Sequence, residues 1–84
     1  LKNPFPNPFN PITRIDYSLP NDTDNLNITI YDVRGRIIKE LENGFKNKGN
    51  HSLNWNASEY ASGIYFINMT VDGYNFNRKI TLLK

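Results

Sequence analysis

Cysteine is absent from the 84-residue chain. This absence excludes a disulfide framework, a thiol nucleophile and a thiolate metal site. Long apolar runs are missing too: none approaches the ~18 residues that a membrane-spanning helix requires, so we expect no membrane insertion. No basic stretch followed by an apolar one marks a secretory signal. If the protein is exported, we expect the chain to be a fragment whose signal lies upstream of Leu1 or is missing.

A strong excess of charge of one sign is also missing. The net charge is only +2, and the basic residues are scattered along the chain, so no nucleic-acid partner is predicted. A chain of this length forms one domain. Such a domain buries only ~60–65% of the surface that its unfolded chain exposes, which leaves a modest core.

Prolines are present, and they are concentrated near the start of the chain, at positions 4, 6, 8 and 11. Each proline sets φ at about −65° and removes a backbone donor, and the residue before it is kept out of the helical region. Residues 1–11 are therefore predicted to be a stiff, extended leading segment packed on a domain of residues 12–84. Phe5 and Phe9 are its available anchors. The open alternative is a proline-rich linker or a ligand of an SH3-like groove.

Apolar and polar residues alternate in the rest of the chain, which is typical of half-buried strands. Turn residues separate the segments: a polar turn at 21–25, Gly35, a loop from Gly44 to Gly49, a loop closed by Gly63, and an Asp72-Gly73 hairpin. No helix is convincing. We predict an all-β fold, a single immunoglobulin-like antiparallel β-sandwich of about seven short strands. The segments that alternate are residues 12–19, 26–31, 37–41, 51–55, 64–71 and 74–84.

The sequence gives little indication of a catalytic site or a metal site. The single histidine, His51, shares the parity of Leu53 and Trp55, which predicts a structural, core-side histidine. A triad with Ser52 and Asp32 would lack a strained nucleophile turn and a glycine-built oxyanion site, so no enzyme is predicted. Oxygen ligands for Ca²⁺ occur in the polar turn, but their spacing does not match an EF-hand, and no metal or cofactor is predicted. These oxygen-bearing residues are Asn21, Asp22, Asp24 and Asn25.

Aromatic residues leave a carbohydrate-binding face open. Trp55 is expected to be buried between the sheets, which is the commoner role of a tryptophan in a sandwich. Tyr31, Tyr60 and Tyr74 would be better placed than Trp55 to contact a sugar.

The last strand is the best candidate for a binding site. Basic and apolar residues are interleaved in residues 78–84. This pattern fits either an ordinary closing strand, whose lysines discourage aggregation at the sheet edge, or a strand presented for capture by strand addition. The physics of the residues leaves both interpretations open. The candidate recognition residues are Arg78, Lys79, Ile80, Thr81, Leu82, Leu83 and Lys84.

Five short motifs follow one another along the chain. They are Phe-Pro-Asn-Pro-Phe-Asn-Pro at 5–11, Tyr-Asp-Val-Arg-Gly-Arg at 31–36, Gly-Asn-His-Ser-Leu-Asn-Trp at 49–55, Ser-Gly-Ile-Tyr at 62–65 and Arg-Lys-Ile-Thr-Leu-Leu-Lys at 78–84. In this order they resemble the type A C-terminal sorting domains of the bacterial type IX (Por) secretion system, which have an Ig-like, FlgD-like β-sandwich. One departure is Asn56-Ala57, where the family often has Asp-Gly. The matching residues outside the last strand that we interpret as structural are Pro6, Asn7, Pro8, Phe9, Asn10, Pro11, Gly35, Trp55, Gly63 and Tyr65.

The resemblance implies a role in export. Such a domain directs a larger N-terminal cargo through the outer-membrane translocon after the precursor has folded in the periplasm. A sortase-like peptidase would then cut upstream of Leu1 or close to it, and the cargo would be released or anchored at the cell surface. The resemblance also implies that the last strand is recognised by the export machinery. We therefore expect removal of residues 79–84 to abolish export while much of the sandwich still forms. The alternative is an accessory Ig-like or carbohydrate-binding module of a secreted glycoside hydrolase.

Overall fold

The computed structural model describes residues 1–84 and contains six strands, all paired antiparallel, and no helix. It therefore has no helical segment that could cross a membrane. The strands are β1 (Ile12–Leu19), β2 (Thr23–Asp32), β3 (Ile37–Lys46), β4 (Gly49–Asn56), β5 (Gly63–Val71) and β6 (Tyr74–Leu82).

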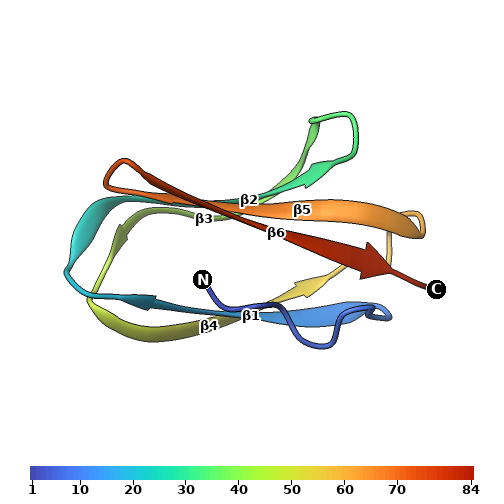
Figure 1. The fold of residues 1–84 in the computed structure, drawn as a ribbon, viewed down its shortest axis with the longest axis horizontal. Helices are drawn as coiled ribbons and strands as arrows, with labels where there is room; N and C mark the ends of the chain where they lie inside the picture. The colour runs from blue at the N-terminus through green and yellow to red at the C-terminus, as the bar shows by residue number, and fades with distance from the viewer.

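The strands form two facing sheets (Figure 1). One sheet pairs β1 with β4, and the other has the order β3-β2-β5-β6. Hairpins join β2 to β3 and β5 to β6, whereas the connections from β1 to β2, from β3 to β4 and from β4 to β5 change sheets. The predicted all-β sandwich is confirmed, with six strands in place of about seven.

The core lies between the two sheets and follows the period of two that strands impose. In β1, the buried residues are Thr13, Ile15, Tyr17 and Leu19, as their shared parity predicts. The same alternation holds in β5 and at the end of β6. In β2, Leu26, Ile28 and Ile30 alternate in the same way, but Thr29 on the other face is buried as well. The other buried strand residues with apolar or aromatic side chains are Leu26, Ile28, Ile30, Trp55, Tyr65, Ile67, Met69, Ile80 and Leu82.

Two turns have the backbone that their sequences predict. Gly35 has φ = 78° in the β2–β3 turn. Asp72 and Gly73 have φ = 48° and 85°, and two consecutive positive φ values are typical of the type I′ turn that the Asp-Gly pair favours in hairpins.

Three element boundaries were predicted wrongly. The polar turn is shorter than residues 21–25, because β2 begins at Thr23, whose buried hydroxyl donates a hydrogen bond to Asp72 Oδ1 (2.7 Å). Strand β3 continues through Gly44 to Lys46, because pairing with β2 supports the strand despite the glycine. Strand β6 ends at Leu82 and does not reach Lys84.

Candidate functional site

The leading segment, residues 1–11, first runs along the outer edge of β1. The backbone N–H of Lys2 donates a hydrogen bond to the Asp16 carbonyl (3.0 Å). Phe5 and Arg14 exchange two backbone hydrogen bonds (3.1 and 2.8 Å), as residues facing each other in an antiparallel sheet do. The segment thus covers one edge of the smaller sheet.

The same segment then crosses to the larger sheet and pairs with the edge strand β6. The side-chain amide of Asn7 donates to the Lys79 carbonyl and accepts from the Thr81 N–H, both at 3.0 Å. The N–H of Phe9 donates to the Thr81 carbonyl, and the N–H of Leu83 donates to the Phe9 carbonyl, again at 3.0 Å. The Asn7 side chain therefore takes the place of a strand backbone, and the segment joins the edges of both sheets.

Phe9 anchors this arrangement, whereas Phe5 does not. The Phe9 ring is 2% exposed and lies 5.7 Å from the Trp55 ring between centroids. Phe5 is 72% exposed, so its expected role as a side-chain anchor was wrong. The backbone is not uniformly extended either: it bends at residues 6–8 and 10–11, and the peptide bonds before Pro6, Pro8 and Pro11 are cis.

Two further hydrogen bonds hold the prolines of the segment. The Thr13 hydroxyl donates to the Pro6 carbonyl (2.9 Å), and the Ala57 N–H donates to the Pro11 carbonyl (2.8 Å). Thr13 is fully buried, so this bond satisfies its hydroxyl within the core.

Aromatic side chains form a cluster around Trp55. This side chain is 1% exposed, and its ring centroid lies 5.6 Å from that of Tyr60 and 5.4 Å from that of Tyr65. The Tyr65 hydroxyl donates to the Ala61 carbonyl (2.7 Å), and burial raises the pKa of Tyr65. The predicted burial of Trp55 is confirmed, and a buried ring cannot stack on a sugar.

The seven candidate recognition residues do not share one environment. Ile80 and Leu82 are fully buried in the core, whereas Lys79, Leu83 and Lys84 are exposed. Asn7 and Phe9 already bond the outward-facing backbone from Lys79 to Leu83, so these backbone groups are not free to pair with an added strand. Sequence reasoning missed this pairing, since no local pattern links position 7 to position 81.

The remaining two candidates, Arg78 and Thr81, are half-buried. The guanidinium of Arg78 donates to the carbonyls of Leu1 and Asn77. Lys84 is hydrogen-bonded to the loop before β5. Its backbone N–H donates to the Ser62 hydroxyl (3.0 Å), and its ammonium group donates to the Ser58 carbonyl. The end of the chain is thus held against the body of the domain.

The polar residues considered for catalysis are engaged in local structure. His51 is half-buried, its ring stacks on that of Tyr17 (5.2 Å between centroids), and its Nε2 lies 2.7 Å from the Asn47 carbonyl oxygen. Asp32 binds its own turn, and hydrogen bonds from the backbone and guanidinium of Arg36 lower the pKa of its carboxyl group. The structure does not join these two residues.

The residues predicted to form a polar turn at 21–25 likewise have structural roles. Asp22 Oδ1 accepts a hydrogen bond from the Lys48 N–H (2.8 Å), and the Asn25 N–H donates to the Thr23 hydroxyl (3.1 Å). No group of three or more His, Cys, Asp or Glu side chains is arranged to hold a metal ion.

Comparison with known proteins identifies the family. A family model described as a secretion system C-terminal sorting domain matches residues 3–83. The chain belongs to this family. It is a C-terminal sorting signal of type IX secretion, and this match does not favour the accessory-module alternative. A sorting domain acts within a precursor whose cargo lies N-terminal to it and is secreted or exported to the cell surface.

A solved structure supports the fold. The sorting domain is similar to FlgD from P. aeruginosa, with a TM-score of 0.53 and 21% identity over 83% of this chain. The match covers 58% of the FlgD chain, so the sorting domain spans less than two thirds of that structure, and the likeness concerns the Ig-like β fold alone. No curated protein sequence matches significantly.

Proposed function

We propose that the outer-membrane secretion machinery reads this sorting domain through the exposed side chains of Lys79, Leu83 and Lys84. The observation that carries the proposal is the closed edge of β6, whose outward backbone groups bond Asn7 and Phe9. Because these backbone groups are occupied, a partner would contact side chains instead: Leu83, which is 55% exposed, the adjacent Lys84, and Lys79 four positions earlier.

Strand addition on this edge is disfavoured for a second reason. A partner strand could only reach the outer side of the leading segment, and Pro6 and Pro8 have no N–H to offer it. The prolines therefore end the sheet, as prolines at natural sheet edges do.

Ile80 and Leu82 have a different role in the proposal. Both side chains are fully buried, so they cannot contact a partner in the folded domain. They hold β6 in register, and the alternation of the strand then turns Lys79 outward. The apolar positions of the terminal motif act by positioning, and the exposed positions act by contact.

The wider route follows from this role. The precursor folds in the periplasm, the translocon passes it, and a sortase-like peptidase cuts before the domain, leaving the cargo released or anchored at the cell surface. The domain itself catalyses no step and uses no cofactor. The secretion machinery binds the domain, and the peptidase then separates it from the cargo.

The test is an export assay in a bacterium that has the type IX system. The domain is fused to a periplasm-targeted fluorescent protein, and the surface and medium fractions are compared with those of a strain lacking the translocon. Replacing Lys79, Leu83 and Lys84 together by Ala should lower translocon-dependent export by about tenfold or more, the effect of losing about 1.4 kcal/mol of binding free energy.

A matched control replaces Lys39, Phe45 and Lys48 by Ala. These residues are also exposed and also comprise two lysines and one apolar side chain, but they lie on β3 and in the β3–β4 turn. Both variants should melt close to the unmodified domain. Normal export of the variant at Lys79, Leu83 and Lys84, or equal losses in both variants, would refute the proposed recognition site.

A further inference from the structure

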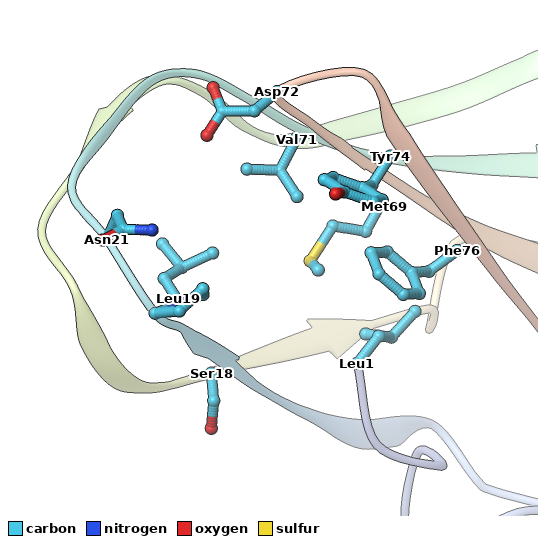
Figure 2. Close-up of a pocket in the computed structure, with 10 residues that line it drawn as sticks. Leu1, Ser18, Leu19, Asn21, Met69, Val71, Asp72, Tyr74 and Phe76 are labelled. Carbon is cyan, nitrogen blue, oxygen red and sulfur yellow. The ribbon is translucent and has the colours of Figure 1, made fainter.

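An apolar cleft opens at the end of the sandwich beside the β5–β6 hairpin (Figure 2). It has a volume of about 370 Å³, and its walls come from β1, β5, β6 and the start of the leading segment. In Figure 2, Leu19 and Met69 point into the open centre and Leu1 points toward Phe76. The apolar side chains that line it are Leu1, Leu19, Met69, Val71, Tyr74 and Phe76.

The path of the leading segment leads into this cleft. Followed backward, the segment pairs with Arg14 at Phe5 and with the Asp16 carbonyl at Lys2. It therefore moves up β1 toward Ser18 and Leu19, which lie at the cleft. Chain that continued beyond Leu1 in the same direction would reach Ser18.

The backbone of β1 is open at that position. Arg14 and Asp16 turn their carbonyl groups to the leading segment, and hydrogen-bonding groups of alternate residues on a strand face the same side. Ser18 has the same parity, so its N–H and C=O face the open edge. Its side chain points away from the cleft and donates to Asn50 Oδ1 (2.6 Å).

We propose that the stretch of the precursor directly before Leu1 docks here, as a short strand on β1 at Ser18 that inserts an apolar side chain into the cleft. The inference rests on the proposed function, because it takes the N-terminal cargo of a sorting precursor to be joined through this stretch. Side chains of alternate residues in a strand point to the same face, so the second residue before Leu1 shares the orientation of Leu1. That residue is the one that fills the cleft.

The chemistry of the cleft selects its occupant. Its lining is mostly aliphatic and aromatic, and Tyr74 is 69% exposed. An apolar side chain would remove this surface from water, and the covalent link to Leu1 supplies the effective concentration that a weak contact needs. Docking would also hold the linker next to the domain, so the accessible bond for the peptidase lies upstream of the docked residues.

The test compares two full precursors by hydrogen exchange and mass spectrometry. One has its native linker, and in the other the residues before Leu1 are replaced by a Gly-Ser sequence of the same length, which is flexible and lacks apolar side chains. The native linker should slow exchange at the Ser18 amide by about tenfold. Exchange in β3, which does not line the cleft, should be equal in both.

A variant checks that the cleft is the receptor. Tyr74→Ala should remove most of the Ser18 protection in the native precursor and change little in the Gly-Ser precursor. Phe45→Ala, a similarly exposed aromatic outside the cleft, should leave the protection intact. Equal Ser18 exchange with both linkers, protection that survives Tyr74→Ala, or a charged residue two positions before Leu1 would overturn the inference. None of these readouts needs the export machinery, so they are independent of the export assay.

Discussion

Phe5 and Phe9 are identical in chemistry and lie four positions apart in one proline-rich segment, yet their environments are opposite. Phe9 lies in the core against Trp55, while Phe5 exposes most of its ring to water. Both have backbone hydrogen bonds to a strand edge, so the backbone pairing does not distinguish them. The difference is that Phe9 faces the space between the two sheets, where Trp55 and its neighbours leave room for one more ring.

This pair gives a matched stability prediction. Phe9→Ala should lower the free energy of unfolding by about 3–5 kcal/mol, because it leaves a cavity beside Trp55. Phe5→Ala should change it by no more than about 0.5 kcal/mol, as is usual for surface positions. Urea unfolding followed by the fluorescence of Trp55 measures both. Similar losses in the two variants would show that the rings contribute through the stiffness of the segment and not through burial.

At the scale of elements, β6 and the leading segment form one unit. The two are far apart in the sequence, but Asn7 and Phe9 bond the backbone of β6 from Lys79 to Leu83. The proline-rich motif at one end of the domain therefore shapes the motif at the other end. A substitution in the leading segment should therefore alter the stability of β6, and a substitution in β6 should alter that of the leading segment.

Asn7 offers the direct test of this coupling. Asn7→Ala removes one donor and one acceptor from the β6 edge, and should lower the free energy of unfolding by about 1–2 kcal/mol at a typical net value for two hydrogen bonds. Asn10→Ala is the matched control: it is also an exposed asparagine followed by proline, and it has no side-chain partner. Amide exchange at Thr81 should speed up in the first variant only. Unchanged exchange there would mean that the Asn7 contact is not held in solution.

Deletion of residues 79–84 is a poorer test of recognition than the sequence suggested. The deletion would remove two fully buried core side chains, Ile80 and Leu82, together with the strand that Asn7 and Phe9 pair with. Loss of folding would then be indistinguishable from loss of recognition. This is why the export assay replaces exposed side chains and keeps the core of β6 intact.

For the molecule as a whole, the burial of Tyr17 predicts how the free energy of unfolding changes at alkaline pH. Its side chain is 2% exposed, and burial, with a smaller contribution from Glu42, raises its pKa from 10.0 to about 12. The folded state thus binds the phenolic proton more tightly than the unfolded state. This contribution to the free energy of unfolding is complete below pH 10 and is lost as the pH rises through about 12.

Tyr17→Phe should flatten this alkaline loss. Urea midpoints measured from neutral pH to about pH 12 should fall less steeply for Tyr17→Phe than for the unmodified domain. Tyr74→Phe, at an exposed tyrosine, should follow the unmodified curve. If the slopes of all three proteins coincide, ionisation of Tyr17 does not limit stability at high pH.

Much of the sandwich could be predicted because its signals are local. Alternation selects the buried face of each strand, as in β1 and β5, and the Asp72-Gly73 pair predicts the hairpin and its positive φ values. The ordered motifs likewise predict the sorting family. Residue identity suffices for these features, because strand period and turn geometry depend on neighbours in the chain.

Topology decided the rest. Only the order of the strands makes β6 an edge, and only the path of residues 1–11 across both sheets closes that edge and leads Leu1 to the cleft. Such contacts join positions more than 70 residues apart, as between Asn7 and Lys79. They depend on the register of the strands and on how the two sheets pack against each other. By itself the sequence determined the fold class, the core faces and the family. The tertiary structure decided which side chains of the terminal motif are exposed to a partner, because exposure depends on what the rest of the chain covers.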